Sequence, residues 1–171
     1  MKKYYINNFT TKEAYQAFIR YMLLNSDAFS FVYFKYRDSD RTKKSTKEIK
    51  DLLKPYKICA RIVNEWPGTI TLNENGHIYR LVMYKACIEA EKALNKASQI
   101  YEWQYPEFPT DLCFYKNGYA WFASCAHENL NWFYTNEQSV IDELTQLGVD
   151  IEYCSDIDDS KMFYDETSLV Q

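Results

Sequence analysis

The chain has 171 residues, 18% of them aromatic, with only four Gly and four Pro. This length is typical of one domain, and this composition excludes collagen-like and low-complexity chains. The formal net charge of −4 conceals a strong polarity, because residues 1–85 carry 16 Lys and Arg against 8 Asp and Glu, whereas residues 86–171 carry 4 against 16. Such polarity favours a recognition protein.

The first half of the chain predicts helices between strands. A short strand is expected over 4–6. Capping-box spacing precedes apolar residues at helical spacing twice, which predicts helices over 11–24 and 45–54. Aromatic and β-branched residues at nearly every position of 29–36 indicate a strand buried on both faces. Alternating polarity over 56–63 indicates a half-exposed strand.

Two Asn-Gly pairs predict two β-hairpins, because this dipeptide readily adopts the positive φ angles of a two-residue turn. The pairs are Asn75-Gly76 and Asn117-Gly118. The expected strands are 69–72 and 77–84 around the first turn, and 112–115 and 119–125 around the second. Between the hairpins, an Ala-, Glu- and Lys-rich stretch predicts a helix over 86–97.

The C-terminal part predicts one more helix over 135–147, with Gly148 as its stop, and a last strand over 149–153. We therefore expect one α+β domain over 1–154, with a mixed or mainly antiparallel sheet of about six to eight strands and about four helices packed on it. Two prolines make 104–110 a candidate subdomain junction. The acidic segment 155–171 has only scattered apolar residues and is expected to be a loose tail.

The five cysteines are odd in number, widely spaced and lack a C-x-x-C pair, so they indicate neither a disulfide framework nor a zinc finger. No apolar run approaches the about 20 residues of a membrane-spanning helix. We expect a soluble, cytoplasmic protein of bacterial or phage origin, monomeric or dimeric, with no membrane association, metal or cofactor. The lack of nucleotide-binding and hydrolase motifs makes a non-catalytic protein the favoured hypothesis.

One compact cluster could nevertheless carry chemistry. Cys125, His127 and Glu128 are residue types that can act together, because a base or cation activates a thiol and a carboxylate orients an imidazole. Catalytic partners are, however, usually distant in sequence. A buried Cys beside a hydrogen-bonded His is the favoured interpretation, and a small enzyme using this cluster is the second alternative.

A basic stretch over 35–61 contains aromatic residues among its cations, as in sites that bind phosphates and bases. It predicts, as the first alternative, a binder of nucleotides or nucleic acid, including a sponge for a signalling nucleotide. The candidate phosphate-binding residues are Arg37, Arg41, Lys43, Lys44 and Lys47. A solvated helix and loop would explain the same pattern without a ligand.

The acidic half combines carboxylates with Trp and Tyr, the residues most often found as interface hot spots. The candidate partner-binding residues are Trp103, Tyr105, Trp121, Trp132, Glu107 and Asp111. We therefore expect a binding protein that blocks or tethers a partner with a basic surface, in the style of a toxin-immunity protein or a phage anti-defence inhibitor.

Overall fold

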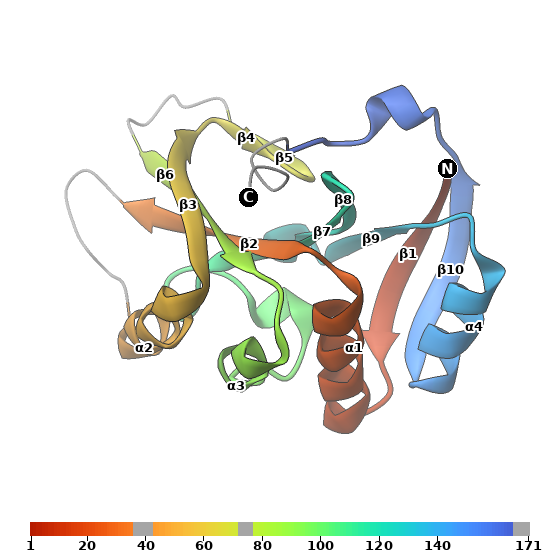
Figure 1. The fold of residues 1–171 in the computed structure, drawn as a ribbon, viewed down its shortest axis with the longest axis horizontal. Helices are drawn as coiled ribbons and strands as arrows, with labels where there is room; N and C mark the ends of the chain where they lie inside the picture. Colours follow the sequence, from red (N-terminus) through yellow and green to blue (C-terminus); the bar gives the residue numbers. More distant parts are fainter. Residues whose placement is uncertain (36–42, 72–76, 166–171) are drawn as a thin grey trace.

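The computed structural model describes residues 1–35, 43–71 and 77–165, and its strands form one antiparallel eight-stranded sheet with the order β10-β1-β9-β8-β7-β2-β6-β3 (Figure 1). These strands are β1 (Lys2–Phe9), β2 (Ala28–Lys35), β3 (Lys57–Val63), β6 (Ile78–Lys85), β7 (Thr110–Lys116), β8 (Tyr119–Cys125), β9 (Leu130–Tyr134) and β10 (Val149–Asp156). Two short strands, β4 (Glu65–Trp66) and β5 (Thr69–Ile70), form a separate hairpin. The predicted α+β fold is confirmed.

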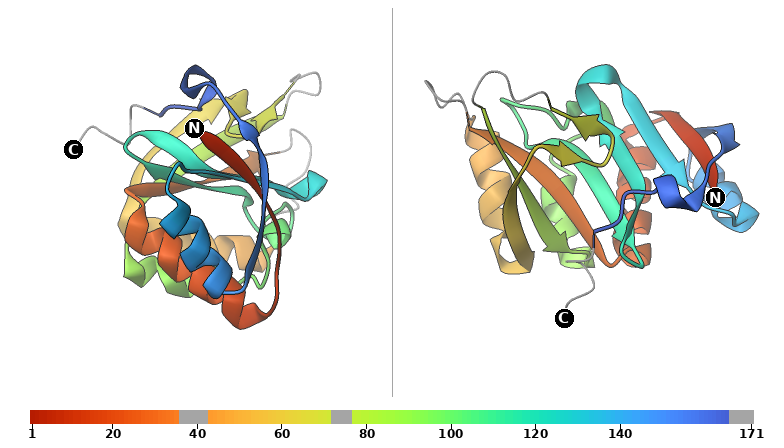
Figure 2. Two further views of the ribbon diagram at one scale, coloured as in Figure 1. Left: turned by 90° about the vertical axis from the view of Figure 1, so that its right-hand side faces the viewer. Right: turned by 90° about the horizontal axis from the view of Figure 1, so that it is seen from above.

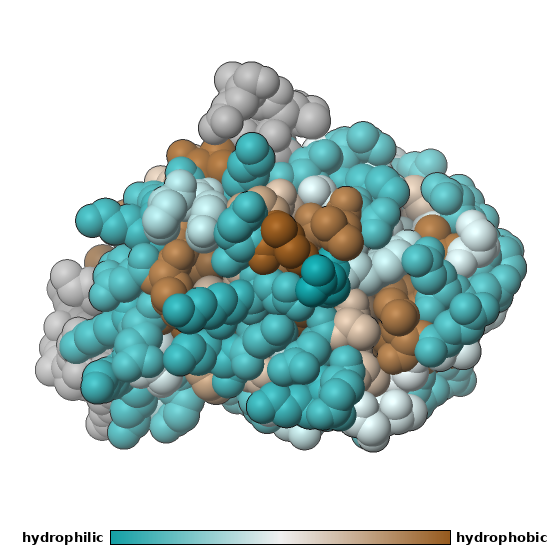
Figure 3. All heavy atoms as spheres, turned by 60° about the horizontal axis from the view of Figure 1, so that its bottom comes forward, coloured by the Kyte–Doolittle hydropathy of each residue, from teal (hydrophilic) through white to brown (hydrophobic). Residues whose placement is uncertain are grey.

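The helices lie on one face of the large sheet, and the β4–β5 hairpin and the chain after β10 lie on the other (Figures 1 and 2). The helices are α1 (Lys12–Asn25), α2 (Lys44–Leu53), α3 (Glu91–Leu94) and α4 (Gln138–Gln146). The main core lies between helices and sheet, and a smaller core around Trp66 lies under the hairpin. The outer surface of the helical layer is mostly hydrophilic, so the helices direct their apolar sides toward the sheet (Figure 3).

Local signals explain where two of the helices begin or end. Thr11 caps α1, because its side chain accepts the N–H of Ala14 at 3.1 Å. Gly148 follows α4 with φ +85° and donates its N–H to the carbonyl of Thr145, as expected for the predicted stop. The second capping-box pattern acts differently: α2 has no side-chain cap, and the hydroxyls of Ser45 and Thr46 donate to the carbonyl oxygen of Glu107.

Of the two predicted hairpins, only the second forms. β7 pairs with β8 through a turn in which Asn117 and Gly118 both have positive φ. The first prediction is wrong, because β5 pairs with β4 while β6 lies between β2 and β3. Its Asn75-Gly76 turn lies outside the described residues. The helix expected over 86–97 is limited to a 3-10 turn and the four-residue α3, and β9 was not predicted.

The C-terminal segment is not loose as far as residue 165, contrary to expectation. β10 extends to Asp156, and the following chain returns along β8, where the N–H of Ala120 donates to Phe163 at 2.9 Å. The carboxylate of Asp165 is buried and pairs with the guanidinium of Arg61. The segment 104–110 ends at Thr110, the first residue of β7, and strands from before and after this segment belong to the same eight-stranded sheet. No helix among the described residues has the length and apolarity to span a membrane.

Candidate functional site

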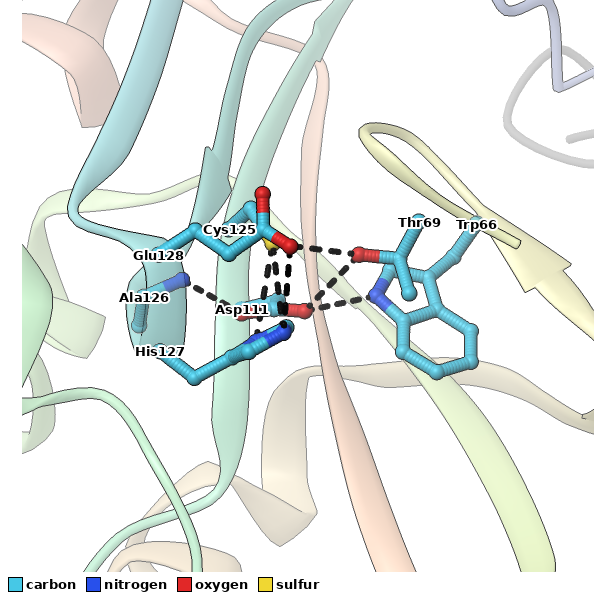
Figure 4. Close-up of polar contacts among 7 residues, drawn as sticks. All are labelled: Trp66, Thr69, Asp111, Cys125, Ala126, His127 and Glu128. Atoms are coloured by element: carbon cyan, nitrogen blue, oxygen red, sulfur yellow. Dashed lines mark hydrogen bonds and ion pairs between the residues drawn. The ribbon is translucent and has the colours of Figure 1, made fainter. Parts of the chain in front are cut away.

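The most unusual polar cluster lies on the hairpin-covered side of the sheet, where β7 begins and β8 ends (Figure 4). Asp111 is near the start of β7, Cys125 is the last residue of β8, and His127 lies in the 3-10 turn that follows (Ala126–Glu128). Asp111 has φ +53°, in the left-handed region that Asp and Asn enter more readily than other residues with a side chain.

The carboxylate of Asp111 is 1% exposed and is held by donors from two directions. Its Oδ1 accepts the backbone N–H of Ala126 at 2.8 Å. Its Oδ2 accepts the indole N–H of Trp66 at 2.8 Å and the hydroxyl of Thr69 at 3.4 Å, both from the β4–β5 hairpin. Burial raises the pKa of this carboxyl group, and the hydrogen bonds partly offset that effect.

The thiol of Cys125 lies between the hairpin and the imidazole. Its Sγ is 3.5 Å from Nδ1 of His127 and 3.6 Å from the hydroxyl of Thr69. Nε2 of the same imidazole is 3.9 Å from Sγ and 3.7 Å from a carboxylate oxygen of Glu128. The structure thus brings together the three residues that the sequence singled out.

This arrangement does not favour a nucleophilic thiol. Cys125 is only 2% exposed, so a substrate carbonyl could not reach its sulfur in this conformation. Burial also raises the pKa of the thiol, whereas a catalytic cysteine needs a lowered pKa to form the reactive thiolate. The enzyme alternative therefore has a thiol, an imidazole and a carboxylate close together, but the thiol lacks both the access and the lowered pKa that catalysis needs.

β7, β8 and the 3-10 turn that follows also bring together three side chains that could bind a metal ion. One carboxylate oxygen of Asp111, Sγ of Cys125 and one imidazole nitrogen of His127 all lie within 4.8 Å of one another. Within the described parts of the chain, no other group of three His, Cys, Asp or Glu residues meets this criterion. The sequence analysis did not predict this set, because Asp111 is 14 residues from Cys125 and only the β7–β8 pairing places it nearby.

A cavity of about 460 Å³ adjoins this cluster, between the hairpin and the C-terminal segment. Trp66 and Thr69, which hold Asp111, also line the cavity, and Lys161 supplies a cation at its edge. The cavity has the size of a small-molecule site, but Asp111, Cys125 and His127 do not line it, so it meets the cluster only through these two hairpin residues.

Three of the predicted partner-binding residues are buried, which corrects that part of the interface prediction. Trp103 is fully buried and donates its indole N–H to the Tyr15 hydroxyl at 3.0 Å. Trp121, 2% exposed, donates to the hydroxyl of Ser26 at 2.9 Å. Asp111 is buried as described above. A buried side chain that already has a hydrogen-bond partner contributes to the fold and not to a surface.

The other predicted partner-binding residues remain accessible in part. Trp132 is half-buried under the hairpin, with the ammonium group of Lys3 5.0 Å from its ring centroid. Tyr105 is half-buried and stacks on Phe34 with 5.9 Å between ring centroids, and the side chain of Glu107 is exposed. Their participation in an interface stays a prediction.

The predicted phosphate-binding residues are only partly described. Arg37 and Arg41 lie outside the described residues, whereas Lys43, Lys44 and Lys47 are exposed at the start of α2. The N–H of Lys43 donates to the carbonyl of Pro106 at 3.1 Å. Carbonyl oxygens of the 106–107 segment thus already face the beginning of α2, where an anion would otherwise be favoured.

A second surface feature emerges at the edge of the large sheet. Residues 134–160 contain eight carboxylate side chains and no Lys, Arg or His, and all eight are exposed on α4, β10 and the neighbouring turns. We call these residues the acidic edge: Glu137, Asp142, Glu143, Asp150, Glu152, Asp156, Asp158 and Asp159. Tyr153, 53% exposed, lies among them on β10. β10 is an edge strand, and β3, beside the Lys-rich helix α2, is the opposite edge (Figure 1).

Comparison with known proteins gives no relative: no family model, no curated protein and no solved structure matches this chain.

Proposed function

We propose that this protein is a non-catalytic binding protein that blocks or tethers a partner with a basic surface, and that the acidic edge is where the partner docks. The observation that carries the proposal is the concentration of eight exposed carboxylates, without one cationic side chain, along residues 134–160. Two cations lie beside this surface: the N-terminal ammonium group is 2.8 Å from a carboxylate oxygen of Asp159, and Lys2 is opposite Asp156 in the β1–β10 pairing. Carboxylates arranged in this way attract a cationic partner and speed its association.

The shape of the acidic edge also bears on the type of partner. β10 is bulged in its pairing with β1, at Cys154, and its outward side chains include Asp150 and Glu152. Bulges and charges on an edge strand discourage pairing with a strand of another chain. We therefore propose that side chains mediate docking, with Tyr153 as the aromatic anchor. A toxin or a nucleic-acid-binding enzyme would present the required basic surface.

The test compares two variants that change the net charge equally. One neutralises the acidic edge with Asp150→Asn, Glu152→Gln and Asp156→Asn, and the control neutralises Glu13, Asp51 and Glu89, which are exposed elsewhere. Both are used as bait in the lysate of the native host, and retained proteins are then purified and titrated by calorimetry.

We expect a basic protein that the wild type and the control bind equally, with an affinity that falls as salt increases. The acidic-edge variant should lose at least 10-fold in affinity for it. Equal binding by both variants, or a partner without a basic surface, would exclude this docking site.

A further inference from the structure

We propose that Asp111, Cys125 and His127 form a three-ligand site for Zn²⁺ or a similar divalent transition metal, with a fourth position open to solvent. The three side chains offer one oxygen, one sulfur and one nitrogen from β7, β8 and the following 3-10 turn (Figure 4). Three protein ligands and one solvent position are the pattern of zinc sites that keep a coordination position free.

The measured spacing fits the ion. A tetrahedral Zn²⁺ with Zn–S of about 2.3 Å and Zn–N of about 2.0 Å places its sulfur and nitrogen ligands about 3.5 Å apart. Sγ of Cys125 and Nδ1 of His127 are 3.5 Å apart. A carboxylate oxygen of Asp111 lies within 4.8 Å of Sγ and of one imidazole nitrogen. Nε2 is 3.9 Å from Sγ, so rotation of the exposed imidazole is needed to direct Nδ1 at the ion.

The groups around the ligands support the same interpretation. The N–H groups of Ala126 and Trp66 fix the carboxylate of Asp111, which still has lone pairs for an ion. If Nδ1 of His127 binds the metal, its Nε2–H faces the carboxylate of Glu128, 3.7 Å away. A carboxylate that accepts the second N–H of a ligating histidine is a recurrent feature of zinc sites, because it fixes the tautomer and raises the basicity of the imidazole.

A bound metal ion would also offset the unfavourable burial of the charged Asp111 side chain. Without a cation, a buried carboxylate and a buried thiol lie side by side beside an exposed imidazole. Binding of Zn²⁺ forms the metal–sulfur bond as the thiol releases its proton to solvent, so the buried charges of both ligands become compensated. Mixed sulfur, nitrogen and oxygen donors favour zinc and its neighbours over Ca²⁺ and Mg²⁺, which prefer oxygen ligands alone.

The test is titration of the reduced full-length protein with Co²⁺, a spectroscopic substitute for zinc. We expect one equivalent to bind, with a thiolate-to-cobalt charge-transfer band and the intense visible bands of tetrahedral cobalt, and both to disappear when Zn²⁺ is added. Cys125→Ser should abolish the charge-transfer band. His127→Gln removes a ligand and should weaken binding by more than the about 10- to 100-fold that loss of a ligand's hydrogen-bond partner costs. The matched controls Cys154→Ser and His77→Gln should leave spectrum and affinity unchanged.

Circular dichroism checks that each variant is folded. If Cys125→Ser does not fold, X-ray absorption at the zinc edge of the wild-type protein decides, with one sulfur and lighter ligands expected in the first shell. A wild-type protein without a thiolate band, a band that persists in Cys125→Ser, or a first shell without sulfur would overturn the proposal.

Discussion

The hydroxyl of Tyr15 connects three elements of the helix-side core. It donates to the carbonyl oxygen of Leu94 at 2.9 Å and accepts the indole N–H of Trp103 at 3.0 Å. All three residues are fully buried. A buried polar group without a partner costs about 1–3 kcal/mol, so this one oxygen satisfies two groups that water cannot reach.

We predict that Tyr15→Phe lowers the free energy of unfolding by about 2–4 kcal/mol, because the Trp103 N–H and the Leu94 carbonyl both lose their partner while the ring stays. Urea denaturation measures this change. The control Tyr101→Phe alters an exposed ring and should change stability by no more than about 0.5 kcal/mol. A similarly small effect of Tyr15→Phe would contradict the prediction.

Single residues of the candidate site differ in how far the sequence could reveal them. Cys125, His127 and Glu128 are neighbours in the chain, so the sequence alone predicts that they lie close together. Asp111 was predicted as a surface residue of a partner interface, because a carboxylate is normally exposed. Its burial results from Trp66 and Thr69, which precede it by more than 40 residues and fold over it as part of a separate hairpin.

At the scale of elements, the β4–β5 hairpin approaches β9 closely at Gly68. Gly68, in the turn of the hairpin, has φ +85°, and a Cβ atom built on it would lie 2.5 Å from Cζ3 of Trp132. A methyl group there would both strain the backbone and push the hairpin away from the indole ring. The hairpin carries the residues that hold Asp111, so this contact also positions the candidate site.

We predict that Gly68→Ala lowers the free energy of unfolding by about 2 kcal/mol or more, the sum of backbone strain and steric overlap. In a Trp132→Leu background the overlap is relieved, so the same substitution should cost clearly less. A double-mutant cycle by chemical denaturation measures the difference. The same cost in both backgrounds would mean that strain alone acts and that the ring contact is unimportant.

The elements most readily predicted were those specified by adjacent residues. The Asn117-Gly118 turn and the capping residue Thr11 determine β7–β8 and the start of α1 through local geometry. The prediction of the first hairpin was wrong because a strand can pair with strands that are distant in sequence. β6 pairs with β2 and β3, neither of which adjoins it in the chain. Similarly, β9 has only five residues, and its strand character depends on pairing with β8 and β1.

At the scale of the whole molecule, the charge polarity of the chain becomes a polarity in space. The sheet order places β10 at one edge and β3 at the other, so the acidic edge and the Lys-rich helix α2 lie at opposite ends of the sheet (Figure 1). The sequence could predict the sign of each half but not this separation, which depends on long-range pairing of β1 with β9 and β10. Attraction of a basic partner would therefore orient the molecule as it approaches.

The many buried tyrosines give the whole molecule a defined response to alkali. Burial raises the pKa of Tyr84 to about 12 and holds the pKa values of Tyr15, Tyr33 and Tyr115 above the ordinary value of 10.0. In the unfolded chain these phenols ionise near pH 10. Between pH 10 and 12 the unfolded state therefore binds fewer protons than the folded state, and the free energy of unfolding falls as the pH rises.

We predict a loss of stability of about 1.4 kcal/mol per pH unit for each such tyrosine across this window. Urea denaturation at a series of alkaline pH values measures the slope, and tyrosinate absorbance should appear together with unfolding and not before it. Tyr84→Phe should reduce the slope by about 1.4 kcal/mol per pH unit, because the substitution removes one titrating phenol from both the folded and the unfolded state. Tyrosinate absorbance that develops while the protein is still folded would show that solvent reaches these phenols in the native state.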